Sequence, residues 1–219
     1  MIASGRVSVN GLPATTGQRV TPGIDRVAVD GRPVEPATTL TYLMMNKPAG
    51  VLTCVGDDRG RPTVVDGLPP GQPRLFPVGR LDVDSRGLLL LTDDGELAVR
   101  LMHPRYHVEK EYRVVINGRP DPDALRRLAE GMVVKGERFQ PASVRVLDGD
   151  AERTRLAMVL REGRKREVRR LWQALGHRVV DLQRTRVDGL QLGDLDEGAV
   201  RSLRPEEVAR LRHAAGLPS

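Results

Sequence analysis

A carboxylate set in a turn between two arginines is the feature of this sequence best suited to chemistry. Residues 78–87 read Val-Gly-Arg-Leu-Asp-Val-Asp-Ser-Arg-Gly and place Asp82 between Arg80 and Arg86. Leucines follow without interruption at 88–91, which predicts a buried element directly after the turn. A carboxylate held on such a platform among cations suits acid–base or nucleophilic chemistry on a polyanion.

The densest cluster of charge lies at residues 161–170, Arg-Glu-Gly-Arg-Lys-Arg-Glu-Val-Arg-Arg. A helix that starts near Lys165 would bury one apolar face, formed by Val168, Leu171, Trp172 and Leu175. The simplest interpretation is a solvated basic helix face. The turn at Gly163 and the density of the cluster favour contact with RNA instead.

Individual arginines of this cluster are predicted to have different roles. Arg166 and Arg170 share the outward face of the expected helix, where they would suit phosphates. Arg169 borders the apolar stripe, so it is the arginine most suited to point inward, and an inward arginine needs a carboxylate. Asp82 is a candidate partner. Asp84 competes with Asp82 for the chemical role, and spacing alone does not exclude it.

Tyr112 begins an expected strand and allows two interpretations. Strands favour aromatic residues, so core or hairpin packing is the usual role of a tyrosine in this position. The functional alternative is an aromatic ring stacked on a base that has been swung out of a nucleic-acid helix.

Composition favours a nucleic-acid partner. The chain has 219 residues, a formal net charge of +6 and a pI near 10.1, which points to RNA or DNA. Aromatic residues make up only 3%, too few for a protein that binds chiefly by stacking many bases.

Several other classes of protein find no support in the sequence. Cys54 is the single cysteine, which excludes an internal disulfide and a cysteine-rich zinc site. Neither a glycine-rich nucleotide loop nor a Gly-x-Ser-x-Gly elbow occurs, so we expect no nucleotide cofactor and no serine-hydrolase chemistry. His103 and His107 have no third ligand near them, so we expect no metal. No signal pattern or long apolar run is present, which predicts a soluble cytoplasmic protein without membrane contact.

Strands and isolated helices alternate along the chain, which predicts an α+β fold. The expected strands are 40–47, 88–91, 112–116, 144–147, 154–160 and 178–182, and the expected helices lie near 93–102, 121–131, 165–175 and 205–213. Asp93 is expected to cap the first helix, with Glu96 reaching back to the first amides. Residues 1–38 form a small module of their own, followed by a main domain at 39–219.

The motifs of the main domain resemble the RsuA/RluB family of RNA pseudouridine synthases. They are Met-Asn-Lys-Pro at 45–48, Gly-Arg-Leu-Asp with the following leucines at 79–92, Lys-Glu-Tyr at 110–112 and the basic segment 162–171. The match spans about residues 40–210. It implies a mixed, mainly antiparallel central sheet flanked by helices, acting as a monomer without cofactor or metal.

The resemblance also implies roles for residues. Asp82 would be the nucleophile that isomerises uridine, and Tyr112 would stack on the uracil, with removal of the C5 proton as an open second role. Arg169 would pair with Asp82, and Val168 would pack against the flipped base. The remaining RNA-binding residues expected are Arg80, Lys47, Arg164, Lys165, Arg166 and Arg170.

Residues 5–35 resemble the end of an S4 RNA-binding domain through the motif Gly-Arg-Val-x-Val-Asn-Gly. Family members carry two helices before this strand, and here almost none of them precedes it. Either the start of the chain is misassigned, or the S4-like module is truncated and binds RNA less tightly.

Ribosomal RNA is the partner that this resemblance implies. Residues 102–104 and 108–112 look more like the large-subunit branch of the family, which favours 23S over 16S rRNA. A noncatalytic RNA-binding protein of ribosome assembly is the main alternative. A DNA-binding regulator is weaker, because no dimer seam is evident and the basic helix uses its apolar face for packing.

Overall fold

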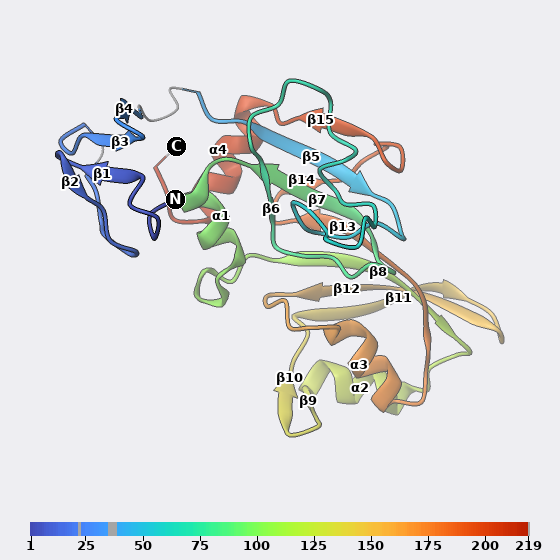
Figure 1. Ribbon diagram of the computed structural model, residues 1–219. Coiled ribbons are helices and arrows are strands. Elements are labelled where there is room, and N and C mark those ends of the chain that lie inside the picture. The colour runs from blue at the N-terminus through green and yellow to red at the C-terminus, as the bar shows by residue number, and fades with distance from the viewer. Residues whose placement is uncertain (22, 35–38, 219) are drawn as a thin grey trace. The chain divides into compact units, whose positions relative to one another are not determined.

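The computed structural model describes residues 1–21, 23–34 and 39–218. The chain divides into two compact units, Met1–Leu40 and Thr41–Ser219 (Figure 1). Thr38 and Ser219, which end the two predicted domains, lie outside the described residues.

The first unit is a small antiparallel sheet built from two tight hairpins. Its strands are ordered β2-β1-β3-β4, with bounds β1 (Val7–Val9), β2 (Leu12–Pro13), β3 (Val27–Val29) and β4 (Arg32–Pro33). Asn10-Gly11 and Asp30-Gly31 turn the hairpins with positive φ at both residues, as asparagine, aspartate and glycine tolerate. Val9 alone among its described apolar residues is buried, so this unit has a very small core.

The second unit is organised around a mixed, mainly antiparallel sheet, as predicted. The strand order along it is β11-β12-β8-β13-β7-β5-β15, with β14 beside β13 and β6 beside β7. The bounds are β5 (Tyr42–Lys47), β6 (Phe76–Val78), β7 (Arg86–Thr92), β8 (Lys110–Asn117), β11 (Ser143–Gly149), β12 (Arg153–Leu160), β13 (Val179–Val187), β14 (Leu190–Gln191) and β15 (Val200–Ser202). A separate hairpin joins β9 (Met132–Val134) to β10 (Glu137–Phe139).

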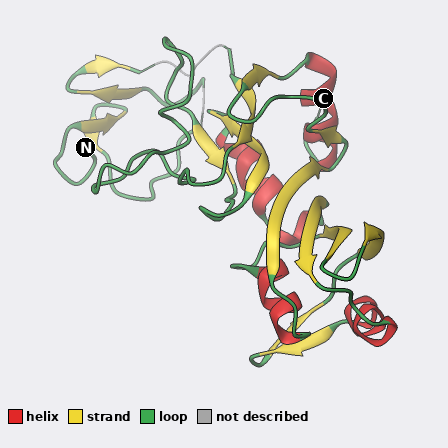
Figure 2. Cartoon of the chain, turned by 90° about the vertical axis from the view of Figure 1, so that its right-hand side faces the viewer, coloured by secondary structure: helices red, strands yellow, loops and turns green. Residues whose placement is uncertain are grey.

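Helices are few beside the strands and loops of this unit (Figure 2). They are α1 (Gly95–Met102), the short 3-10 helix η1 (Pro104–Tyr106), α2 (Pro122–Glu130), α3 (Glu167–Ala174) and α4 (Pro205–Ala214). Within the described part of the chain, none of the helices combines the length and apolar character that crossing a membrane requires.

Helix α2 agrees with its predicted bounds, whereas the cap predicted for α1 is wrong by one residue. Asp94 caps α1 by accepting a hydrogen bond from the Leu97 amide at 3.0 Å. Asp93 is already engaged, because it accepts a hydrogen bond from the Thr41 amide at 2.7 Å. Glu96 does not reach back to the first turn and instead pairs with Arg100 at 2.7 Å.

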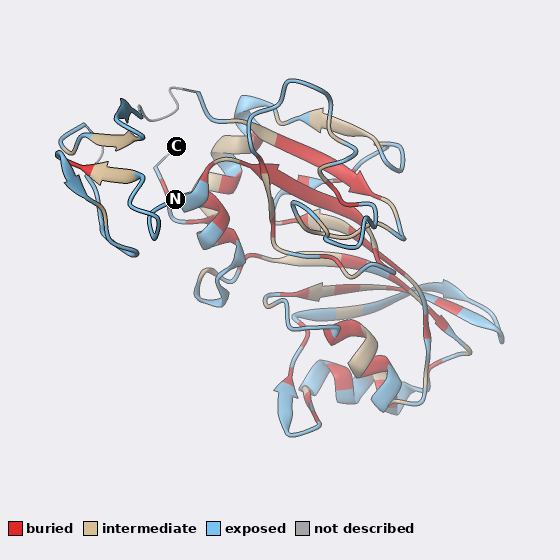
Figure 3. Cartoon of the chain, viewed as in Figure 1, coloured by how far each residue is buried: buried red, intermediate tan, exposed pale blue. Residues whose placement is uncertain are grey.

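The apolar core lies on both faces of the sheet. Because side chains alternate along a strand, Leu89 and Leu91 enter one cluster and Leu88 and Leu90 enter another. The first cluster includes Trp172 of α3, and the second is closed by α1 and α4. Strands β5 and β7 are accordingly buried along most of their length (Figure 3).

One short parallel pairing joins the two halves of the sheet. Strand β7 meets β13 in register at two positions, Arg86 with Gln183 and Gly87 with Arg184. Gly87 has a φ of +107°, and a Cβ atom placed on it would lie 2.3 Å from the Arg184 carbonyl oxygen. Only glycine therefore allows the two strands to approach this closely.

Candidate active site

The turn that carries Asp82 connects two paired strands, and its backbone is fixed by burial and a hydrogen bond. Strand β6 ends at Val78 and β7 starts at Arg86, so residues 79–85 form the connection. Leu81 is buried, and its carbonyl accepts a hydrogen bond from the Thr53 hydroxyl at 2.8 Å. Asp82 itself stays partly exposed, with 27% of its side chain accessible. The turn therefore presents a carboxylate on a fixed backbone.

Lys47 holds this turn from inside the protein and does not reach the surface. Its ammonium donates hydrogen bonds to the carbonyls of Pro48 and Ser85, each at 2.8 Å, and to that of Asp82 at 3.4 Å. The side chain is fully buried. The prediction that Lys47 binds RNA directly is therefore wrong, because the buried backbone carbonyls of the site need a donor. Burial lowers the pKa of Lys47 to about 8, against the raising effect of Asp84 and Asp82.

Replacing Lys47 by Met is expected to impair activity more than stability. The carbonyls of Pro48 and Ser85 would lose this donor, at about 1–3 kcal/mol each, whereas the Asp82 carbonyl keeps the Ser85 amide at 3.0 Å. The cost of burying the cation, about 3 kcal/mol from its lowered pKa, would disappear. The turn would lose its anchor, and a shift of about 1 Å in Asp82 corresponds to roughly a 100-fold loss of turnover. Chemical denaturation and single-turnover rates measure the two effects.

Lys110→Met is the matched control for this prediction. Burial also lowers the pKa of Lys110 to about 8, but its ammonium donates to the Val108 carbonyl and not to the Asp82 turn. An equal loss of turnover in both variants would contradict the anchoring role of Lys47.

Two arginines neutralise the carboxylates of the turn, in an arrangement that differs from the predicted one. The guanidinium of Arg166 lies 3.7 Å from a carboxylate oxygen of Asp82 and binds both oxygens of Asp84, at 3.1 and 3.2 Å. Arg169 pairs with Asp84 at 3.4 Å and donates to its carbonyl at 2.9 Å. Among the described residues no ion pair joins Arg169 to Asp82, so that predicted pairing is wrong.

The backbone at the start of α3 explains why Arg166, and not Arg169, lies near Asp82. The helix begins at Glu167, and the preceding Arg166 adopts left-handed backbone angles, φ 53° and ψ 32°. This conformation turns Arg166 away from the helix axis and toward the turn of Asp82 and Asp84. Arg169, one turn further along, is also held by the Val179 carbonyl at 3.1 Å.

Burial and the neighbouring arginines have opposing effects on the ionisation of Asp84. Burial acts to raise the pKa of Asp84, but the hydrogen bond from Arg166 and the charge of Arg169 outweigh it, and that pKa is lowered. Asp84 is therefore a saturated partner of two arginines. Asp82 is the carboxylate that keeps a looser contact, which suits a group that must react.

A cavity of about 220 Å³ opens beside Asp82. This volume is below the roughly 300–1,000 Å³ of sites for drug-sized molecules, so it suits a group the size of one base. Tyr112 and Val168 contribute nearly buried apolar surface to it. The cavity thus brings together most of the predicted site residues, including Arg80, Asp82, Tyr112, Arg164, Lys165, Arg166 and Val168.

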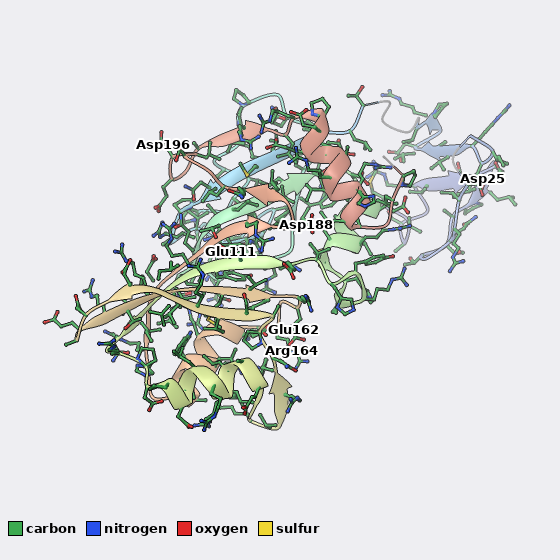
Figure 4. The ribbon with its side chains drawn as sticks, turned by 180° about the vertical axis from the view of Figure 1, so that it is seen from behind. Asp25, Glu111, Glu162, Arg164, Asp188 and Asp196 are labelled. Atoms are coloured by element: carbon green, nitrogen blue, oxygen red, sulfur yellow. The ribbon has the colours of Figure 1, made fainter. Side chains whose placement is uncertain are left out.

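Arg164 and Arg170, both predicted to bind RNA, are also engaged by residues of the protein itself. Their guanidinium groups lie 4.9 and 4.7 Å from the ring centroid of Phe139, a cation–π arrangement. Arg164 also pairs with Glu162 at 2.9 Å, next to which it lies in Figure 4, and Arg170 pairs with Glu137 at 2.8 Å. Both arginines therefore fasten the β9–β10 hairpin to α3, and the outward face shared by Arg166 and Arg170 is not formed.

Glu167 is a residue of the cavity wall that sequence reasoning missed. It is 3% exposed, one oxygen accepts a hydrogen bond from the Arg164 amide at 3.2 Å, and the other has no partner among the described residues. Burial, with the nearby charge of Glu162, raises the pKa of Glu167 to about 7. In the sequence, Glu167 directly precedes Val168, the first residue of the predicted apolar helix face, and this position could have indicated that its side chain is buried.

Three comparisons with known proteins bear on this site. The family model described as RNA pseudouridylate synthase matches residues 41–174. Ribosomal large subunit pseudouridine synthase B of Bacillus subtilis is 40% identical over 218 residues, covering 98% of this chain and 88% of that protein. The protein of the same name from Haemophilus influenzae is 40% identical over 228 residues, covering all of this chain and 63% of its own length.

Solved structures agree with the sequence matches. A crystal structure of a pseudouridylate synthase superimposes with a TM-score of 0.74 at 32% identity, over 96% of this chain and 90% of that one. The pseudouridine synthase fold predicted for the main unit is thereby confirmed.

Proposed function

The chain belongs to the RNA pseudouridylate synthase family, and from this membership we propose that it isomerises a uridine of 23S ribosomal RNA, with Asp82 as the nucleophile. The observation that carries the proposal is the cavity, where a carboxylate from one strand connection meets an aromatic ring from β8 and an apolar wall from α3. Relatives named as large-subunit enzymes support 23S rRNA as the substrate.

The reaction breaks the N1–C1′ bond of uridine and forms a C5–C1′ bond, while C5 loses a proton and N1 gains one. The Asp82 carboxylate attacks C1′ as uracil departs, which splits one difficult step into two easier ones. The freed uracil turns within the cavity between Tyr112 and Val168. Carbon C5 then displaces the carboxylate from C1′, and the carboxylate is regenerated.

The cations of the site lie around the carboxylate without occupying it. The guanidinium of Arg166 is 3.7 Å from a carboxylate oxygen of Asp82, too far for a close hydrogen bond, so that carboxylate is left accessible to the sugar. Arg169 acts through Asp84 and the backbone of the turn. Arg80 is exposed at the cavity, where it suits the displaced strand or the stack that the uridine vacates.

The N-terminal unit is proposed to add an S4-like contact with RNA. Arg6 is paired with Asp30, which removes one cation from this contact. Arg19, Arg26 and Arg32 are the other basic residues of the unit. Such a contact positions the RNA without choosing the uridine, since phosphate contacts carry no sequence information.

Incubation of the purified protein with an unmodified 23S rRNA transcript tests the proposal, with pseudouridine mapped chemically. We expect one modified uridine, or a few, in 23S rRNA and none in a 16S transcript treated in parallel. Modification of the 16S transcript alone would contradict the proposed substrate. Binding of both transcripts without modification would contradict the proposed reaction.

Replacing Tyr112 by Phe is expected to lower turnover by about 100-fold, the low end of general acid–base effects. The ring lines the cavity, and its hydroxyl makes no hydrogen bond with the described residues, so it is available to the substrate. The phenyl ring keeps the stacking and the packing in the core. Single-turnover rates and thermal unfolding measure both properties, and unchanged turnover would limit Tyr112 to stacking.

A further inference from the structure

Half of one face of the main sheet has no helix over it. Helices α2 and α3 contribute to the core cluster that contains Tyr112, Val114 and Ile116 of β8. On the opposite face, α1 and α4 pack with the leucines of β7, while the described helices leave β11, β12 and β8 uncovered there. Strand β11 is accordingly exposed along most of its length (Figure 3).

Arginines are aligned across this open surface by the register of the strands. Arg145 of β11 pairs with Ala157 of β12, which pairs with Arg113 of β8, and Arg113 pairs with Gln183 of β13. Residues directly opposite one another lie on the same face. Neighbouring strands are about 4.8 Å apart, so Arg145 and Arg113 are separated by roughly 10 Å across the small side chain of Ala157.

These two arginines have no ion pair with any described residue, in contrast to their neighbours. Arg86 is bound by Asp181 at 2.7 Å, and Arg186 is bound by Glu111 at 3.2 Å. Figure 4 shows Glu111 on its strand from this side of the molecule. Arg113 and Arg145 are both exposed, so their guanidinium groups can reach a ligand from solvent.

A groove of about 420 Å³ runs along this surface, and we call it the sheet groove. Three arginines line it, Arg113, Arg145 and Arg186, together with two carboxylates, Glu111 and Asp194. Arg186 pairs with Glu111 at 3.2 Å, so these two charges compensate each other. The lining keeps an excess of positive charge, since three arginines face two carboxylates, and such a surface suits a hydrated anion better than the apolar face of a protein partner.

We propose that the sheet groove binds the phosphate backbone of the RNA substrate at a place separate from the uridine cavity. This inference rests on the proposed function, which supplies RNA as the partner. Planar guanidinium groups held in register are suited to phosphate oxygens. Tyr112 and Arg113 are successive residues of β8 and point to opposite faces, so the groove and the cavity contact different segments of the RNA.

The double variant Arg113→Gln/Arg145→Gln tests the proposal through the salt dependence of binding to a 23S rRNA transcript. Each phosphate contact contributes roughly 0.7–0.9 to the slope of log affinity against log salt, so losing two should reduce the slope by about 1.6. Affinity near 0.1 M salt should fall about tenfold or more. Arg113→Lys/Arg145→Lys keeps both charges and should retain most of the slope.

Arg119→Gln/Arg127→Gln is the matched control, because it removes two exposed arginines that lie outside the sheet groove and, like Arg113 and Arg145, have no ion pair with the described residues. Equal slopes and affinities for the control and the groove variant would overturn the proposal, as would a lysine variant as weak as the glutamine variant. Thermal unfolding of all variants shows whether each is folded. Pseudouridine formation by the unaltered protein reports separately on the proposed function, which can hold while the groove proposal fails.

Discussion

Asp82→Asn is expected to eliminate pseudouridine formation, with a loss of about 1,000-fold or more, as is usual when a nucleophile is removed. The amide has nearly the shape of the carboxylate but no charge, so it neither attacks C1′ nor stabilises positive charge on the sugar. Asp82 has one distant ion pair, with Arg166 at 3.7 Å, so its loss leaves the fold intact. Mapping of the transcript and RNA binding measure the two properties.

Asp84→Asn is the matched control, since it changes a carboxylate of the same turn. It removes the negative charge that pairs with Arg166 and Arg169 and should cost about 1 kcal/mol of stability, as expected for a partly exposed pair. The activity of this variant should fall no more than about tenfold, because Asp84 is not among the residues that line the cavity. If the Asp84 variant were inactive and the Asp82 variant active, Asp84 would be the nucleophile.

Glu167→Gln is expected to stabilise the protein at pH 8 by about 3 kcal/mol. The pKa of Glu167 is about 7 in the folded protein, against an ordinary value of 4.5, because burial disfavours the carboxylate. This difference corresponds to about 3 kcal/mol at pH values above the folded pKa. Glutamine keeps an oxygen to accept the hydrogen bond from the Arg164 amide and carries no charge.

The pH dependence of this effect has a definite sign. Between about pH 4.5 and 7 the folded protein retains the Glu167 proton that the unfolded chain releases, so this residue makes stability fall as pH rises. Below pH 4.5 both states are protonated, and the variant and the unaltered protein should be equally stable. Denaturation of both at pH 4, 6 and 8 measures the difference, and a difference independent of pH would contradict the assignment.

Elements with strong local signals could be predicted from the sequence. Helix α2 is bounded by Asp121-Pro122 and Gly131, and each of these residues determines its own end by capping or backbone preference. Four consecutive leucines at 88–91 are apolar enough to predict a buried segment without knowledge of the fold, and they are buried. The resemblance of the motifs was sufficient for the family and for the cavity residues Asp82, Tyr112 and Val168.

Pairings between distant residues could not be predicted in the same way. Spacing within the basic segment placed Arg169 toward the interior but did not reveal the left-handed conformation of Arg166, which decides which arginine meets Asp82. The burial of Lys47 depends on the carbonyls of Ser85 and Pro48 around it. Arg170 is turned to Phe139 by a hairpin whose position only the folded chain determines.

The close contact at Gly87 has a consequence for how this enzyme can be divided or recombined. Asp82 belongs to the part of the sheet built on β5, β6 and β7, whereas Tyr112 and Val168 belong to the part built on β8, β12 and α3. The two parts meet through the short parallel pairing at Gly87. Neither part alone lines the whole cavity. A chimera that takes one part from a relative therefore needs a glycine, or an equally close backbone contact, where β7 meets β13.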